Sequence, residues 1–337
     1  MNESSPRALN VAVIQGGPSA EAEVSRTSAA GVAGALQQAG HNVQRLELEP
    51  ALARNLLEQS FDVAFPVTHG RLGEDGGLQG LLEVLGIPYV GSGVLACALA
   101  CDKVRAKHAF RAHKLPLAAQ LVVHINDDLD GTIGPLRDQF PAGIAVKPPT
   151  QGSAIGVSLV RDMNDTDTIR AALRDAFKYD EYVLVERLVT GREVTCAVLD
   201  ASALGGLRAL PVTEIFSKAA AWYDFESRYA TGGSEHACPA SLPPGVAERV
   251  QHIACSAHRA LGCRDLSRVD FVVGDGDDES AVTLLEVNVI PGMTATSLYP
   301  EAAAAAGFSF PALCDGMVRS AIARQPAGPV EAIPMPG

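Results

Sequence analysis

A chain of 337 residues is long enough for two or three compact units, each with a hydrophobic core of its own. Its formal net charge of −12 argues against nucleic acid as the main partner, because a phosphate backbone attracts clustered Lys and Arg. No apolar run has the length of a membrane span, residues 1–10 lack the apolar core of a signal peptide, and the seven scattered cysteines are typical of reduced core thiols. We therefore expect a cytoplasmic protein that binds neither nucleic acid nor a membrane.

The first unit, residues 1–101, has the pattern of a doubly wound α/β domain. A strand at residues 9–14 leads through Gly16-Gly17 into a helix that we expect to end near residue 39. Glu21 falls near the start of this helix. A carboxylate there is favoured by the helix dipole alone, so helix stabilisation and ligand binding both explain it at this point.

A glycine-rich segment follows the strand expected at residues 63–67. Residues 68–77 hold four glycines and His69, and a helix is expected at residues 78–85. Ligands of open α/β sheets bind at the carboxyl ends of parallel strands. The segment is therefore a candidate binding loop, although a single histidine in such a place also occurs for structural reasons.

The second unit, residues 102–190, has a lysine before a flexible connection. Lys147 ends an expected strand, and the Gly/Ser-rich residues 148–156 connect it to the next one. Backbone N–H groups of such a connection contact anions, which predicts a flap over phosphates. It is not a P-loop, because the order of that motif is missing. Glu186 is the one acid in the apolar strand expected at residues 182–189.

The third unit runs from residue 191 to residue 325, and residues 326–337 are expected to form a frayed tail. Residues 216–240 have no clear periodicity but carry several aromatic side chains, among them Tyr229. A segment of this length without secondary structure is typical of a lid over a site. Helix-forming residues at 246–261 follow it.

Two β-rich runs, at residues 268–273 and 282–288, flank a Gly/Asp turn and predict an antiparallel hairpin. Residues two apart on a strand share a face. One face should therefore collect a guanidinium and three oxygen-bearing side chains: Arg268, Asp270, Glu286 and Asn288. Such oxygens are ligands of Mg²⁺. Considered alone, the pattern is explained as well by a buried polar hairpin held by an Arg–Asp pair.

Together, these motifs resemble the D-alanine–D-alanine ligase family of the ATP-grasp superfamily. The resemblance covers nearly the whole chain, and its motifs follow one another in this order: Gly-Gly-Pro-Ser-Ala-Glu21, His69-Gly-Arg-x-Gly-Glu-Asp-Gly, Asp102-Lys103, Lys147-Pro, Gly152-Ser153, Glu186, Glu193, Arg268-x-Asp270, Glu286-x-Asn288 and Pro291-Gly-Met-Thr-x-x-Ser297-Leu298. It implies a three-domain ATP-grasp fold with an N-terminal α/β domain (1–101), a central subdomain (102–190) and a C-terminal subdomain (191–325) that carries the lid.

The resemblance implies an ATP site between the second and third units. Lys103 and Lys147 are expected to bind the phosphates from either side, with the Gly152-Ser153 loop closing over them. Arg228 in the lid is expected near the γ-phosphate.

The nucleoside end of the ATP site is assigned in the same way. Glu186 is expected to bind the adenine amino group and Glu193 the ribose hydroxyls. The backbone of Arg187 and Leu188 is expected to form the adenine edge of the cleft.

The resemblance places two Mg²⁺ ions, for which Mn²⁺ can substitute, on Asp270, Glu286 and Asn288, with Glu286 bridging them. Arg268 and the backbone N–H of Gly292 are expected to stabilise the oxyanion of a tetrahedral intermediate.

The amino-acid substrates are expected beside the hairpin. The resemblance implies that Glu21 binds the ammonium of the first D-alanine, with His69 beside it. It also implies that Ser297 and Leu298 bind the carboxylate of the second D-alanine. Tyr229 is expected to move in with the lid and to contact Ser153 and Glu21. A homodimer is implied as well.

The implied activity is ATP-dependent synthesis of D-alanyl-D-alanine for peptidoglycan, through an acyl phosphate. Three positions depart from the family pattern: Arg228 replaces a lysine, Ala154 a serine, and Val289-Ile290 a segment with a threonine. A dipeptide ligase of specialised metabolism with other amino-acid substrates is therefore an alternative. A nucleotide-binding regulator without turnover is a third hypothesis, which the retained residues of the hairpin disfavour.

Overall fold

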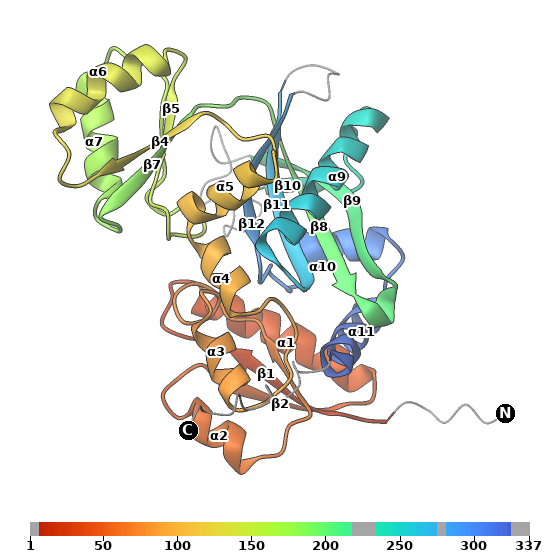
Figure 1. Cartoon of the computed structure of the whole chain (residues 1–337). Helices are drawn as coiled ribbons and strands as arrows, with labels where there is room; N and C mark the ends of the chain where they lie inside the picture. Colours follow the sequence, from red (N-terminus) through yellow and green to blue (C-terminus); the bar gives the residue numbers. More distant parts are fainter. Residues whose placement is uncertain (1–6, 218–233, 275–280, 325–337) are drawn as a thin grey trace, which may run out of the picture.

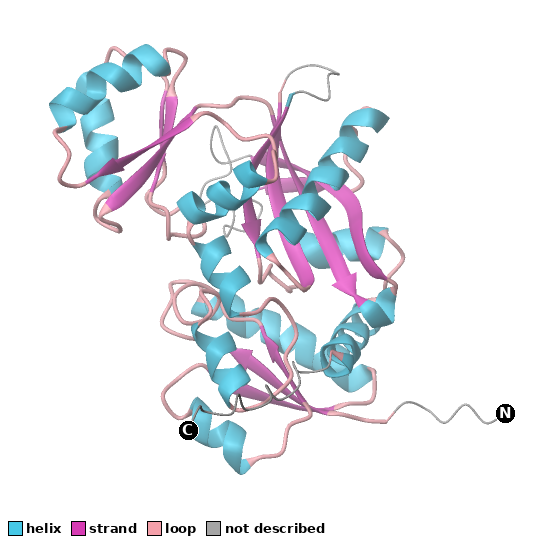
Figure 2. Ribbon diagram, in the orientation of Figure 1, coloured by secondary structure: helices cyan, strands magenta, loops and turns pink. Residues whose placement is uncertain are grey.

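The computed structural model describes residues 7–217, 234–274 and 281–324, so Arg228 and Tyr229 lie outside the described residues. Figure 1 shows three bodies, each built around one sheet, and Figure 2 shows that helices accompany every sheet. Among the described helices, none combines the length and the apolar character needed to cross a bilayer.

The N-terminal body is a parallel sheet, as the sequence predicts. β1 (Asn10–Gln15) lies between β2 (Asn42–Glu47) and β3 (Val63–Pro66). Its helices are α1 (Ala22–Gln38), α2 (Leu52–Glu58), α3 (Gly77–Val84) and α4 (Val94–Cys101). A single parallel bridge between Tyr89 and Ala64 extends the contacts of this sheet beyond β3.

The central body is a four-stranded antiparallel sheet with two helices. The strand order is β4 (Gln120–His124), β7 (Tyr182–Arg187), β5 (Ile144–Lys147) and β6 (Ser158–Val160). The helices are α6 (Leu129–Gln139) and α7 (Thr166–Ala176). Their apolar faces form a separate core with the sheet, which includes Phe140, Ile169 and Val183.

The C-terminal body holds a five-stranded antiparallel sheet. Its strand order is β10 (Ser234–Ala237), β9 (Gly206–Ser217), β8 (Arg192–Ala201), β11 (Asp265–Val273) and β12 (Val282–Asn288). Helices α9 (Pro244–Leu261), α10 (Leu298–Ala305) and α11 (Phe310–Ala323) and the short η1 (Ser202–Leu204) accompany it.

Alternation along β8 separates the two faces of this sheet. Cys196 and Val198 belong to the core that contains α9, whereas Ala197 and Leu199 belong to the core that contains α10 and α11. Successive side chains of a strand point to opposite faces, so both faces of this central strand are covered.

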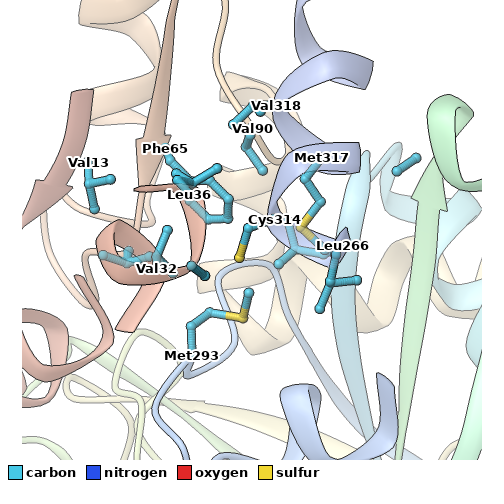
Figure 3. Close-up of a cluster of buried hydrophobic side chains, with 14 of the residues drawn as sticks. Val13, Val32, Leu36, Phe65, Val90, Leu266, Met293, Cys314, Met317 and Val318 are labelled. Carbon is cyan, nitrogen blue, oxygen red and sulfur yellow. The ribbon is translucent and has the colours of Figure 1, made fainter. Parts of the chain in front are cut away.

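The core that contains α10 and α11 also includes residues of the N-terminal body. Figure 3 shows Val32 and Leu36 of α1 and Phe65 of β3 gathered with residues of α11 such as Met317. Met293, which follows β12, also joins the cluster. The N-terminal and C-terminal bodies are therefore held by one continuous hydrophobic core.

Three features differ from the sequence-based expectation or go beyond it. Helix α6 was not predicted, since Gly131, Gly134 and Pro135 weaken the helix signal there. The expected irregular segment 216–240 is too wide, because β9 extends into it and β10 lies within it, paired to β9. Helix α5 (Lys103–Ala112) packs Phe110 into the core that contains α9, away from the core of the central body.

Candidate active site

The hairpin of β11 and β12 places its polar side chains on one face, as predicted. Arg268 pairs with Asn288 and Asp270 with Glu286 across the two strands. Residues that are directly opposite, and residues two apart, share a face in an antiparallel pair. Thr195 of β8, opposite Asp270 on the other side, donates its hydroxyl to Asp270 Oδ1 at 2.6 Å.

Asp270 is the common acceptor of the hairpin face. Arg268 donates to its two oxygens at 2.9 and 2.8 Å, and Asn288 Nδ2 donates at 3.1 Å. Lys103 Nζ lies 3.1 Å from Glu286 Oε2. Positively charged groups thus face both acids, which is the charge complement that a cation would provide.

The donor set fits a hard cation. Asp270 and Glu286 supply carboxylates, and rotation of the Asn288 amide would present its oxygen in place of its N–H group. Within the described ranges, no cluster of three or more His, Cys, Asp or Glu side chains could hold a metal ion. The predicted set contains only two such side chains, and its third member is an amide.

A cavity of about 420 Å³ lies between the central sheet and the hairpin. Many of its lining residues were predicted for the ATP site: Lys103, Lys147, Glu186, Arg187, Leu188, Glu193, Asp270 and Glu286. Apolar side chains such as Ala145, Leu159 and Leu285 line it too. An apolar slot with a few converging charges is typical of a nucleotide site.

Main-chain groups at one end of this cavity are partly occupied. The N–H groups of Arg187 and Leu188 donate to Ala119 O at 2.8 Å and Gly143 O at 2.9 Å. The next residue, Val189, also lines the cavity, and its N–H makes no hydrogen bond to another described residue. Val189, which was not predicted as part of the site, therefore has a main-chain donor available to a ligand.

Glu186 is buried between two lysines. Lys147 Nζ lies 2.7 Å from Glu186 Oε2, and Lys107 Nζ lies 2.7 Å from Glu186 Oε1. Burial by itself raises the pKa of Glu186, but the two ammonium groups outweigh burial and lower it to about 2. Glu186 is therefore a carboxylate at neutral pH. Lys107 was not predicted as part of the site.

The residues on either side of Gly152 anchor the phosphate flap. Lys103, the first residue of α5, donates its ammonium to Gln151 O at 2.7 Å. Ser153 donates its hydroxyl to Glu21 Oε1 at 2.6 Å. Gly152 lies between these two contacts and lines a second cavity. The flap thus bridges the N-terminal body, α5 and the central body.

This second cavity, of about 340 Å³, lies further along the same hairpin face, beside Arg268 and Asn288. It brings together the residues predicted for the amino-acid substrates with those predicted for the oxyanion and the flap: Glu21, His69, Ser297 and Leu298, then Arg268 and Gly292, and Ser153. Asn288 lines it as well. Because Asp270 and Glu286 line the first cavity and Arg268 and Asn288 the second, the hairpin face separates the two cavities.

The turn after β12 is closely packed. A β carbon on Gly292 would lie 2.8 Å from Ser297 Oγ, so any larger residue would force that hydroxyl to shift. Ser297 Oγ accepts the N–H of Thr294 at 3.0 Å. Leu298 begins α10, whose N-terminus favours a carboxylate in the cavity.

Two titratable groups, the buried His69 and the partly buried Glu74, share this cavity with Glu21. Burial lowers the pKa of His69, and its Nε2 has no hydrogen-bond partner among the described residues. Burial, opposed by the N–H of Gly70 and assisted by the charge of Glu21, raises the pKa of Glu74 to about 7. Glu74 belongs to the motif that follows His69 and was not predicted as a site residue, although it lines the same cavity.

A family model for the D-ala D-ala ligase C-terminus matches residues 129–319, and one for the D-ala D-ala ligase N-terminus matches residues 47–92. The chain belongs to the D-alanine–D-alanine ligase family. It is 43% identical over 303 residues to the D-alanine–D-alanine ligase of Geobacter sulfurreducens, with 90% of each chain covered. The corresponding protein of Gluconobacter oxydans is 42% identical over 320 residues, which cover 94% of this chain and all of the relative.

Solved structures of the family agree with the fold. The D-alanine–D-alanine ligase of Bacillus anthracis, in a crystal structure complexed with ATP, has a TM-score of 0.77 and 29% identity. The similarity covers 94% of this chain and 98% of that one. The ATP-grasp fold that the motifs implied is thereby confirmed.

Proposed function

We propose that this protein joins two D-alanine molecules to D-alanyl-D-alanine for peptidoglycan synthesis, with ATP converted to ADP and phosphate. The observation that carries the proposal is the hairpin face of β11 and β12. Its acids line the nucleotide cavity, while its guanidinium lines the cavity with the amino-acid residues. Phosphoryl transfer from one cavity to a carboxylate in the other requires this arrangement.

For the nucleotide, we propose that Glu186 accepts the adenine amino group and that Glu193 binds the ribose. Arg187 and Leu188 would then line the adenine edge, with Val189 N–H as the main-chain donor. Lys103 and Lys147 enter the cavity from α5 and β5 and would neutralise phosphate charge together with the flap at Gly152.

For the metal, we propose two Mg²⁺ ions on Asp270, Glu286 and Asn288, with Glu286 shared and Mn²⁺ as a substitute. When bound, such ions neutralise phosphate oxygens and orient the nucleotide for in-line attack. Arg268 and Lys103, which face these acids, would then be released to turn to substrate groups.

In the first step, the carboxylate of one D-alanine attacks the γ-phosphorus, the bond to the bridging oxygen breaks, and ADP leaves. Such transfer is catalysed mainly by positioning and charge neutralisation. Glu21 would hold the ammonium of this D-alanine, with His69 beside it, and Lys103 and Lys147 would hold the phosphates.

In the second step, the amine of the other D-alanine, after losing a proton, attacks the acyl carbon, and the bond to phosphate breaks. Arg268 and Gly292 N–H would stabilise the oxyanion, and such donors contribute about 3–4 kcal/mol each. The α10 N-terminus at Ser297 and Leu298 would hold the carboxylate of the second molecule.

The acyl phosphate must be protected from water, which calls for closure of the site. We propose that the lid residues Arg228 and Tyr229, outside the described ranges, complete the enclosure over Ser153 and Glu21. The contact between Ser153 and Glu21 supports this proposal, because it already joins the flap to the N-terminal body.

A homodimer in the cytoplasm completes the proposal. The family resemblance supports the dimer, and the seven free thiols support a reducing compartment. Size-exclusion chromatography with light scattering tests the dimer directly.

Release of ADP from purified protein with Mg²⁺ tests the function. D-alanine should support release, and D-alanyl-D-alanine should appear as product. Other D- and L-amino acids are assayed in parallel. Preference for one of them would establish the alternative dipeptide ligase, which the departures at Arg228, Ala154 and Ile290 favour. Nucleotide binding without release for any amino acid would establish the regulator.

A further inference from the structure

Lys107 is the most deeply buried charged side chain beside the nucleotide cavity. It lies one helical turn after Lys103 on α5 and is 1% exposed. Its ammonium forms an ion pair with Glu186 Oε1 at 2.7 Å, and it makes no hydrogen bond of regular geometry to a described residue. Glu186 lines the nucleotide cavity, whereas Lys107 lines neither cavity. Lys107 therefore lies behind Glu186 and contacts the cavity only through it.

The other oxygen of Glu186 has a partner of a different kind. Lys147 Nζ is 2.7 Å from Oε2, and Lys147 lines the cavity. The three side chains carry two positive charges and one negative charge in a buried place. A nucleotide brings negative phosphates, which can draw Lys147 away from Glu186, whereas the buried Lys107 lines neither cavity and keeps its contact with Glu186.

The departure of Lys147 would leave Oε2 of Glu186 open to a ligand. A carboxylate accepts hydrogen bonds and donates none, so it binds the amino group of a purine and repels a carbonyl oxygen in its place. A buried carboxylate stays ionised only when a positive charge compensates it. After Lys147 has moved, Lys107 is the one charge among the described residues in contact with Glu186 that can do this.

We propose that Lys107 is a positioning residue that keeps Glu186 ionised and oriented while its other oxygen exchanges Lys147 for the purine 6-amino group. The site thereby selects 6-amino over 6-oxo purine nucleotides. The inference rests on the proposed nucleotide site and extends it from Glu186 to a residue outside the cavity. Burial lowers the pKa of Lys107, and the carboxylate of Glu186 opposes this shift without reversing it.

Direct binding tests the proposal without the ligation reaction. ADP and inosine diphosphate, which differ at the 6-position of the purine, are titrated calorimetrically into wild-type protein and two variants. Lys107→Met removes charge and hydrogen bonding, and Lys107→Gln retains a donor for Glu186 but no charge. Lys178→Met is the matched control, because Lys178 forms an ion pair with Asp175 at the surface and is 69% exposed.

We expect Lys107→Met to weaken ADP binding by roughly tenfold and inosine diphosphate binding much less, because a hydrogen bond to a charged group is lost for ADP alone. Lys107→Gln should fall between wild type and Lys107→Met. Lys178→Met should match wild type for both nucleotides. In the Glu186→Gln background, Lys107→Met should change neither affinity by more than about twofold, because its effect passes through Glu186.

Equal weakening for both nucleotides in Lys107→Gln, or an unchanged preference in that variant, would overturn the proposal and leave Lys107 a structural residue. Lys107→Gln decides the matter if Lys107→Met does not fold. Failure of the ligase function has a different signature, since ADP release with D-alanine would be absent while the nucleotide preference still depended on Lys107.

Discussion

Replacement of Gly292 by alanine tests whether the turn after β12 holds the amino-acid substrates. The added β carbon would lie 2.8 Å from Ser297 Oγ and 3.5 Å from Ser297 Cβ. The Ser297 hydroxyl cannot yield freely, because its oxygen accepts the N–H of Thr294 at 3.0 Å and lies 2.7 Å from Thr294 Oγ1. Movement of the Ser297 hydroxyl away from the added β carbon therefore breaks two hydrogen bonds at the N-terminus of α10.

Each of these hydrogen bonds contributes about 0.5–1.5 kcal/mol, so their loss costs about 1–3 kcal/mol. If this cost falls on the bound state, the D-alanine concentration for half-maximal ADP release should rise roughly 5- to 150-fold. The KM for ATP should change little, because Gly292 and Ser297 line the amino-acid cavity and not the nucleotide cavity.

The assay is ADP release against D-alanine concentration at saturating ATP. Gly34→Ala serves as control, because a β carbon at Gly34 in α1 would meet nothing within 4 Å. The double variant Gly292→Ala with Ser297→Ala removes the overlapping hydroxyl and should resemble Ser297→Ala alone. Unchanged D-alanine dependence in Gly292→Ala, or additive losses in the double variant, would refute the reasoning.

Three further predictions concern the metal, a buried acid and the interface between the bodies. Glu286→Gln should reduce ADP release by a factor on the order of 100 or more at unchanged melting temperature, and Glu181→Gln, at an exposed position, is the control. Undiminished ADP release by Glu286→Gln would show that the hairpin is not part of the active site. Burial raises the pKa of Glu74 from 4.5 to about 7, so the folded state keeps a proton that the unfolded state loses, and stability should fall as pH rises from about 4.5 to about 7. The free energy of unfolding, measured with denaturant at pH 5 and pH 8, should be lower at pH 8 for this reason in wild type and in the control Glu58→Gln, at an exposed position, but not in Glu74→Gln. An equal pH dependence of all three proteins would contradict the prediction. Asp265→Asn should lower the free energy of unfolding by about 2 kcal/mol, because Asp265 Oδ2 accepts from Gly91 N–H and Arg324 Nη2, both at 2.7 Å. An unchanged free energy of unfolding would show that these contacts do not stabilise the interface between the bodies.

Much of the site was predictable because it follows from strand periodicity. Arg268, Asp270, Glu286 and Asn288 lie at spacings of two on adjacent strands, so pairing of the strands brings them together whatever surrounds them. Glycine-rich segments likewise marked the loops that hold His69 and Gly152.

Residues that act through burial were harder to find. Lys107 has no motif of its own, and only the packing of α5 places its ammonium against Glu186 on a strand far along the chain. The unusual pKa of Glu74 depends on desolvation, which sequence spacing does not encode. Helix α6 was missed because its glycines and proline oppose local propensity, while Ile133 and Leu136 bury an apolar face in the core of the central body.

The hydrophobic cluster shared by α1, β3, α11 and the turn at Met293 has a mechanical meaning. It joins the two bodies that bear Glu21 and Ser297 through one core, whereas the core of the central body is separate. Any displacement of the central body would therefore leave most residues of the amino-acid cavity in place and would shift only those of the flap, Gly152 and Ser153.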